Sequence, residues 1–186
     1  MVGGPTVAEI MTGLVMTTTP NASLDEAARL LRECHVSGLP VVDAEDRVVG
    51  VLSEKDIVRL LHRATGVGHP RGLLDVLLES APTRGENVLA VCRRRLRNTR
   101  VKDVMSHPVV SVGPETSLIE AAHLMKMKGV SRLPVLDTYQ RLVGIVTRCD
   151  IVGDLSTPAL RARGSLHPAP IAARPGARRS DPYMDI

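Results

Sequence analysis

An internal repeat limits the folds open to this chain more than any other property of its sequence. Residues 7–58 align with residues 101–152 at a constant offset of 94 without a gap, and 22 of the 52 aligned pairs are identical. A match of this length at one fixed offset indicates two copies of one structural unit. The chain is therefore expected to fold as two similar halves.

Each copy contains the pattern of one amphipathic helix. Apolar residues follow the spacing of a buried helix face at positions 24, 27, 28 and 31 and again at 118, 121, 122 and 125. Ser23 and Ser117 stand directly before these positions, and serine is a favoured N-cap residue. The pattern predicts one capped helix in each copy.

A hairpin pattern follows the helix. In the first copy, the apolar runs 39–42 and 48–52 are separated by the polar stretch 43–47. Two short apolar runs around a polar connection predict a β-hairpin. Asp43 and its counterpart Asp137 are typical turn residues.

The remaining elements complete a βαββα unit in each copy. A short strand is expected around Val15 or Val109, and a second helix starts near Glu54 or Arg148. Because such a unit leaves one sheet face uncovered, we expect an α/β (α+β) fold with two motifs packed about a pseudo-two-fold axis and a binding cleft between them. The expected boundaries are motif 1 at 6–64, a helical insert at 65–98, motif 2 at 99–155 and a disordered tail at 156–186.

The insert carries its own helical patterns, at residues 72–80 and 86–98. The second of these places Val88, Cys92 and Leu96 on one stripe, with four arginines largely off it. A solvated basic helix face explains the arginines, and a contact with a partner or a nucleic acid is the alternative.

Composition narrows the class of protein. Hydrophobic residues make up 44% of the chain, which is enough for a core, but aromatic residues make up only 1%, so a ligand base would lie against aliphatic side chains. The net charge of +4 comes mainly from arginines in the insert and the tail. The three cysteines have no metal-ligand spacing, and neither a signal peptide nor a membrane-length apolar run is present, so we expect a cytoplasmic protein with reduced thiols.

Four motifs occur in both copies. They are V-x-[DE]-[IV]-M at 7–11 and 101–105, V-S-x-L-P-V at 36–41 and 130–135, the Asp that follows shortly after, and G-[VI]-[LV]-[ST]-x-x-D-I at 50–57 and 144–151. Together they resemble the CBS-domain pair, or Bateman module. The resemblance implies a homodimer that binds AMP, ADP, ATP or S-adenosylmethionine in the clefts between the motifs, with no catalysis and no required cofactor.

The chemical centre of each expected cleft is a hydroxyl residue followed three residues later by an aspartate: Thr147 with Asp150, and Ser53 with Asp56. The resemblance implies that the carboxylate accepts hydrogen bonds from ribose hydroxyls, which suits a group that only accepts. The alternative is that the pair caps the helix that starts there. Both roles can hold together.

The resemblance also groups the ligand-binding residues. One cleft is expected to combine Thr6, Met11, Val36, Ser37, Arg132, Thr147 and Asp150, and the second to combine Ser53, Asp56, Met105, Val130 and Ser131. The position equivalent to Arg132 is Gly38, so the first cleft is expected to prefer phosphorylated ligands.

Two function classes remain open from the sequence. The first is a regulatory module that binds an adenosine-type nucleotide. The second is an adaptor for proteins or nucleic acid that uses the arginines of the insert or tail and has vestigial clefts. No catalytic triad pattern, phosphate-binding loop or metal-spaced histidine set occurs, so an enzyme or a metal site is not expected.

Overall fold

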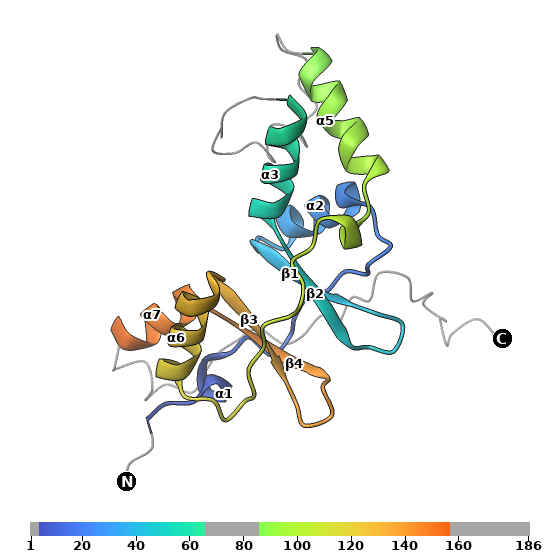
Figure 1. Cartoon of the computed structure of the whole chain (residues 1–186). Coiled ribbons are helices and arrows are strands. Elements are labelled where there is room, and N and C mark those ends of the chain that lie inside the picture. Colours follow the sequence, from blue (N-terminus) through green and yellow to red (C-terminus); the bar gives the residue numbers. More distant parts are fainter. Residues whose placement is uncertain (1–3, 66–85, 157–186) are drawn as a thin grey trace, which may run out of the picture.

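The structure is a computed structural model and describes residues 4–65 and 86–156. In chain order its elements are α1 (Val7–Ile10), α2 (Leu24–Glu33), β1 (Gly38–Val42), β2 (Val48–Ser53), α3 (Glu54–Thr65), α5 (Glu86–Asn98), the 3₁₀ turn η1 (Val101–Asp103), α6 (Leu118–Lys128), β3 (Arg132–Leu136), β4 (Leu142–Thr147) and α7 (Arg148–Ser156). They form two halves, one with the β1–β2 hairpin and one with the β3–β4 hairpin (Figure 1).

The helices begin where the caps were predicted. The Ser23 Oγ accepts a hydrogen bond from the Glu26 backbone N–H at 3.2 Å, and a Glu26 carboxylate oxygen accepts one from the Ser23 N–H at 2.9 Å. Ser117 Oγ accepts from the Glu120 N–H at 3.2 Å. These bonds satisfy N–H groups that have no partner inside the helix, and they fix the start of α2 and α6.

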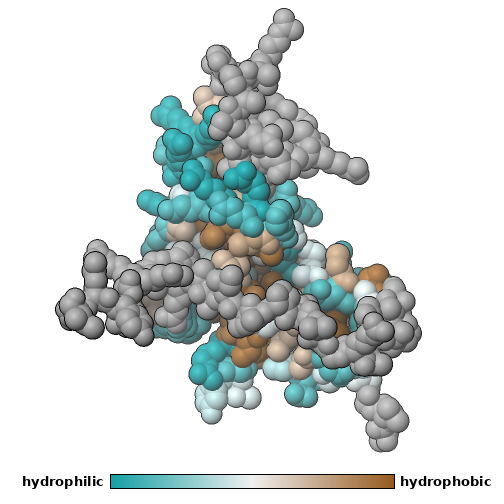
Figure 2. All heavy atoms as spheres, turned by 180° about the vertical axis from the view of Figure 1, so that it is seen from behind, coloured by the Kyte–Doolittle hydropathy of each residue, from teal (hydrophilic) through white to brown (hydrophobic). Residues whose placement is uncertain are grey.

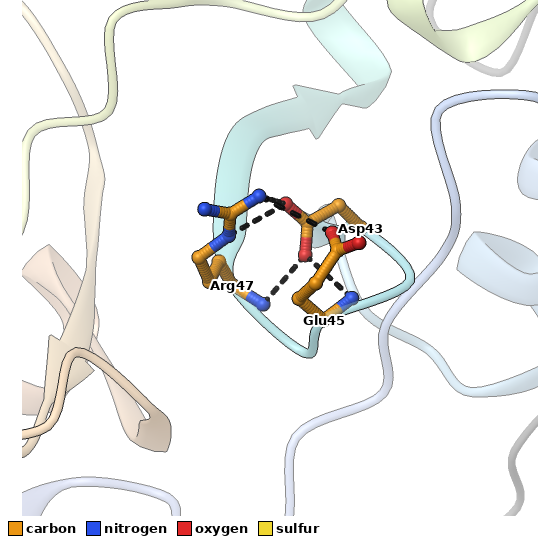
Figure 3. A network of polar contacts seen from close by, with 3 residues as sticks. All are labelled: Asp43, Glu45 and Arg47. Carbon is orange, nitrogen blue, oxygen red and sulfur yellow. Dashed lines mark hydrogen bonds and ion pairs between the residues drawn. The ribbon is translucent and has the colours of Figure 1, made fainter.

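Both hairpins are antiparallel and have the same register, with Pro40 opposite Val51 and Pro134 opposite Ile145. In the first turn, Asp43 Oδ1 accepts from the backbone N–H groups of Glu45 and Arg47 at 3.0 and 2.9 Å, while Oδ2 accepts from the Arg47 side chain (Figure 3). Asp137 repeats this pattern in the second turn. The turn role predicted for both aspartates is confirmed.

The prediction of a first strand around Val15 and around Val109 is wrong. Val15 and Val109 lie outside any strand, and one residue, Thr18 or Val112, forms a single parallel bridge to β1 or β3. Thr18 donates to the Pro40 carbonyl and accepts from the Val42 N–H. The next bonds of a parallel ladder would need N–H groups on Pro40 and Pro20, and proline has none. Pro134 and Pro114 stand at the same places in the second copy.

The leading segment of each copy packs on the other half. Val7 of α1 is buried in the core of the second half, and its N–H donates to the Thr116 carbonyl at 2.9 Å. Conversely, Val101 of η1 is buried in the core of the first half, and its N–H donates to the Ala22 carbonyl at 3.0 Å. The repeat boundaries in the sequence therefore differ from the boundaries of the two packed halves.

A pseudo-two-fold axis relates the halves. Arg47 and Arg141, which are equivalent in the repeat, form an antiparallel bridge with each other. The bridges Thr12 to Ile145 and Ser106 to Val51 are equivalent to each other in the same way. Equivalent residues of two related halves become neighbours only where the symmetry axis passes between them, so the pseudo-two-fold axis passes between Arg47 and Arg141.

The insert contributes α5, with the boundaries predicted from the sequence. Cys92 and Leu96 are buried in the core of the first half, where α5 packs on α2 and α3 (Figure 1). The helix expected at 72–80 and the tail expected from 156 lie outside the described residues, apart from Ser156 at the end of α7. Over the ranges 4–65 and 86–156, no helix is long and apolar enough to span a bilayer.

Candidate functional site

A cavity of about 740 Å³ lies between the two halves. The first half contributes Ser37, the end of β2 and the start of α3. The second half contributes residues 128–132 and Arg148, and the chain segment 106–110 forms a further wall. Both copies of the repeat are therefore needed to form it.

The Ser53–Asp56 pair lies at the junction of β2 and α3 and lines this cavity. Asp56 is only 9% exposed, and its Oδ2 accepts from both the backbone N–H and the hydroxyl of Ser53, the former at 3.0 Å. Arg59 lies 3.7 Å from the other carboxylate oxygen. The carboxylate thus caps α3 through one oxygen, and the other faces a cation that is half exposed.

Arg132, the first residue of β3, lines the same cavity. Its Nη2 donates to the Ser37 Oγ at 2.9 Å, which ties the second half to the first. Burial lowers the pKa of Arg132 from its ordinary value, and Asp56 and Glu54 act in the opposite direction. An arginine remains protonated at neutral pH, so the cavity holds a partly desolvated cation.

The sequence analysis grouped Arg132 with Thr147 and Asp150. In the structure Arg132 stands opposite Thr147 in the β3–β4 hairpin, whereas it lines the cavity together with Ser53 and Asp56. The reason is steric: Arg132 and Gly38 are equivalent in the repeat and meet near the pseudo-axis, where a Cβ on Gly38 would overlap the Arg132 guanidinium. Only one of the two positions has room for a large side chain, and Arg132 extends across Gly38 toward the first half.

The cavity has an excess of positive charge. Its walls carry five side chains that are cationic at neutral pH and two that are acidic, Glu54 and Asp56. The cations are Lys55, Arg59, Lys128, Arg132 and Arg148. In a concave site this balance attracts anions. Val51, Val109 and Val130 supply apolar wall next to these charges.

The other expected pair, Thr147 and Asp150, repeats the capping geometry at the start of α7. Asp150 Oδ2 accepts from the Thr147 N–H at 2.7 Å and from its hydroxyl at 2.8 Å, and the Asp150 N–H donates to Thr147 Oγ1 at 3.3 Å. The capping alternative thus describes both pairs. In both pairs these hydrogen bonds use a single carboxylate oxygen, Oδ2.

The other predicted site residues divide between the halves. Thr6 caps α1, and Met11 packs its sulfur against Gly144 of β4, so both lie by the half that carries Thr147 and Asp150. Met105 packs in the equivalent way against Gly50. Val130 and Ser131 line the cavity with Ser53, and Ser37, which the sequence analysis placed in the other cleft, lines it too. Val36 is 37% exposed and lies outside the cavity lining.

Several lining residues were not predicted. Lys55 and Arg59 lie one helical turn apart on α3, and this spacing was visible in the sequence. Lys128 and His107 carry no motif that separates them from surface residues. Arg148 donates to the Val130 carbonyl at 2.8 Å and so holds the wall segment 128–132 in place.

Comparison with known proteins decides the family. The CBS domain model matches twice, at residues 7–63 and 101–156. The chain belongs to the CBS-domain family. Its two matched segments are the two copies of the repeat, and together they form a CBS-domain pair.

Relatives of this pair occur in archaea and plants. An uncharacterized protein of Methanocaldococcus jannaschii is 31% identical over 151 residues, which cover 78% of this chain and 88% of that protein. The chloroplastic CBS domain-containing protein CBSX2 of Arabidopsis thaliana is 32% identical over 152 residues, or 81% of this chain and 63% of the relative. Inosine-5'-monophosphate dehydrogenase of M. jannaschii is 29% identical, but the chain spans only 22% of its length.

The structure of CBSX2 in complex with AMP has a similar fold. It aligns with a TM-score of 0.60 at 30% identity and covers 82% of this chain and 97% of the CBSX2 chain. The CBS domain of a CBS domain-containing membrane protein from Sphaerobacter thermophilus aligns with a TM-score of 0.61 at 26% identity, over 81% of this chain and 87% of the other. Two CBS motifs packed as a pair are thus common to all three.

Proposed function

We propose that this CBS pair is a regulatory module that binds an adenosine-type nucleotide in the cavity between its halves. The proposal rests on one observation: the Ser53–Asp56 pair and the Arg132 guanidinium line the same cavity. A carboxylate that accepts from ribose hydroxyls and a cation that contacts phosphate are the two groups that a nucleoside phosphate needs. The AMP complex of CBSX2, a relative of similar fold, supports the ligand class.

In the proposed complex, the Asp56 oxygen that faces Arg59 accepts from the ribose diol, and Arg132 donates to the phosphate. The adenine lies against Val51, Val109 and Val130, since the chain offers few aromatic rings. The positive charge of the cavity favours AMP, ADP and ATP over S-adenosylmethionine, which carries a sulfonium cation. The Thr147–Asp150 pair is the centre of a second, weaker nucleotide site.

The proposal includes the cellular form of the protein. The module acts as a cytoplasmic homodimer and regulates a partner instead of catalysing a reaction. Light scattering behind a sizing column tests the dimer. A monomer at micromolar concentration contradicts this part alone.

Calorimetric titration with AMP, ADP, ATP and S-adenosylmethionine tests the nucleotide site. Asp56→Asn removes the charged ribose acceptor, and Asp150→Asn is its matched control in the other copy. Loss of a charged hydrogen-bond acceptor costs about 1.5 to 3 kcal/mol, so Asp56→Asn is expected to weaken AMP binding about tenfold to 150-fold. Unchanged affinity in Asp56→Asn, or no binding of any of the four ligands to the wild type, would contradict the proposal.

The adaptor alternative is favoured by one observation on α5, where Arg94, Arg95 and Arg97 are exposed. Such a surface suits a polyanion such as nucleic acid. An electrophoretic mobility shift with duplex DNA and RNA at two salt concentrations separates the alternatives. Salt-sensitive binding that Arg94→Ala and Arg95→Ala abolish, together with no nucleotide binding, supports the adaptor.

A further inference from the structure

Helix α3 carries a stripe of cations that runs outward from the cavity. Lys55, Arg59 and Arg63 recur every four residues, so they lie on one side of the helix, and all three are exposed. Lys55 and Arg59 line the cavity, whereas Arg63 lies beyond its lining. At a rise of about 1.5 Å per residue, the stripe extends about 12 Å along α3. It therefore connects the nucleotide cavity with the outer surface of the first half.

Helix α5 packs beside α3 and adds further cations (Figure 1). Arg94, Arg95 and Arg97 are exposed on it. No acidic residue follows Asp56 in α3 or Glu86 in α5, so the two helices are uniformly basic over most of their length. Figure 2 shows that the part of the molecule around α3 and α5 is largely hydrophilic, whereas hydrophobic residues reach the surface of the second half.

The equivalent helix α7 lacks the stripe. The positions of Lys55 and Arg59 correspond to Cys149 and Gly153, and the next residue of α7 is acidic, Asp154. The second half nevertheless forms the same hairpin and the same pair of helices. The fold therefore does not require these cations, and a basic surface that the fold does not require indicates an anionic partner.

The chemistry of the surface favours a duplex nucleic acid among polyanions. Proteins that bind single strands stack the bases on aromatic rings, and α3 and α5 contain no Phe, Tyr or Trp. Arginine and lysine contacts with phosphates need no aromatic ring and do not depend on base sequence. A duplex carries one negative charge per about 1.7 Å of its axis, so about seven phosphates lie within the 12 Å length of the α3 stripe.

We infer that α3 and α5 form a surface that binds the phosphate backbone of double-stranded nucleic acid, and that a nucleotide in the cavity competes with this binding. The inference rests on the proposed nucleotide site and assigns it a regulatory output. Lys55 and Arg59 belong to both sites, because they line the cavity and begin the stripe. A phosphate monoester carries about −1.5 to −2 charges at pH 7, so a bound nucleotide offsets these cations and repels the duplex.

This competition is reciprocal and depends on ligand charge. If AMP weakens duplex binding by some factor, the duplex must weaken AMP binding by the same factor. ATP carries more charge than AMP and should have the larger effect, whereas adenosine carries none and should leave duplex binding nearly unchanged. The adaptor alternative, with vestigial clefts, allows no such competition.

Variants outside the cavity test the surface. Fluorescence anisotropy with a labelled DNA duplex of about 20 base pairs, between about 50 and 200 mM salt, measures binding. Arg63→Ala and Arg94→Ala should each weaken it about twofold to fivefold and reduce the slope of log affinity against log salt by about 0.9, with AMP affinity unchanged. Lys126→Ala, which removes an exposed cation of α6, is the matched control and should leave duplex binding unchanged.

Variants inside the cavity test the competition. Saturating AMP should weaken duplex binding of the wild type at least about fivefold, and calorimetry with the duplex present should show the same factor for AMP. Arg59→Ala should weaken both ligands, because Arg59 belongs to both sites. Asp56→Asn should bind the duplex as the wild type does and no longer respond to the same AMP concentration, because it loses the ribose acceptor and no cation.

The outcomes separate the surface from the nucleotide site. No binding of the duplex at about 100 µM protein and 50 mM salt overturns the surface, and calorimetry with AMP alone still judges the nucleotide site. Duplex binding that neither AMP nor ATP weakens, although calorimetry shows that both bind, overturns the competition. A wild type that binds the duplex but no nucleotide contradicts the proposed function and the competition together. Tighter binding of single-stranded DNA or polyglutamate than of the duplex overturns the choice of partner.

Discussion

Replacing Arg132 with alanine should weaken AMP binding far more than adenosine binding. The guanidinium lines the cavity beside the Ser53–Asp56 pair and is held by Ser37 at 2.9 Å. A guanidinium can donate two parallel hydrogen bonds to a phosphate, whereas adenosine offers it no anionic group. The difference between the two ligands therefore isolates the contact with phosphate from any change in the shape of the cavity.

The expected loss of AMP affinity follows from the charge and the burial of the Arg132 guanidinium. A hydrogen bond to a charged group contributes about 1.5 to 3 kcal/mol, which corresponds to about a tenfold to 150-fold loss of AMP affinity. Because Arg132 is partly buried, the upper part of this range is expected. Adenosine affinity should change by less than about twofold. The difference should shrink as salt rises, since the Debye length falls from about 10 Å at 0.1 M to about 3 Å at 1 M.

Calorimetric titration of the wild type and Arg132→Ala with both ligands, at low and high salt, measures this difference. Arg132→Lys keeps the charge but loses the paired donors, and is expected to lie between the two. Combining Arg132→Ala with Asp56→Asn and, separately, with Asp150→Asn identifies the cleft. Non-additive losses are expected only with Asp56→Asn, because only that carboxylate shares a ligand with Arg132.

Two results would refute this reasoning. Equal losses for AMP and adenosine would mean that Arg132 shapes the cavity and does not contact the phosphate. Non-additivity with Asp150→Asn instead of Asp56→Asn would place Arg132 in the other cleft, in conflict with its contact to Ser37.

Three further predictions concern stability and reactivity. Leu96→Ala is expected to destabilise the first half by about 2 to 5 kcal/mol in urea unfolding, because Leu96 is the α5 residue that is fully buried in this core, and a loss below about 1 kcal/mol would mean that α5 is not part of the core. Hydrogen bonds, first from the Arg47 backbone N–H, lower the pKa of Asp43. A folded-state pKa below the unfolded value of about 4 stabilises the protein when the pH is above that unfolded pKa, and this stability is lost as the pH falls through the folded-state pKa. Asp43→Ala should therefore flatten the acid side of a plot of stability against pH, and an unchanged plot would contradict this. Burial raises the pKa of the Cys92 thiol, so a thiol reagent should label the exposed Cys149 faster than Cys92, and equal rates would show that α5 opens readily.

The sequence predicted the elements that depend on local patterns. Ser23 and Ser117 cap helices because capping needs only neighbouring residues, and Asp43 fixes its turn for the same reason. The bounds of α5 followed from apolar spacing alone. The strands expected at Val15 and Val109 were wrong, because strand length depends on the partner, and the prolines of β1 and β3 withhold the donors that a longer ladder needs.

The sequence could not predict which residues of one half contact the other half. A repeat shows that positions such as Gly38 and Arg132 are equivalent, but it does not show that they meet near the axis, and this meeting decides which cleft receives the guanidinium. The packing of Val7 on the second half and of Val101 on the first was hidden for the same reason. Both copies of the repeat carry the same leading motif, so the sequence is equally consistent with packing of that motif on its own half or on the other half.

The exchange of leading segments bears on how such a chain can arise or be divided. Cutting the chain between α3 and α5 would remove Val101 from the core of the first half and Val7 from that of the second. A single copy of the repeat could complete its core in the same way by taking this segment from a second molecule. When two copies are fused into one chain, the leading segment of each copy packs on the other copy within the same molecule. An isolated half would need a permuted order, with residues 4–12 joined after α7.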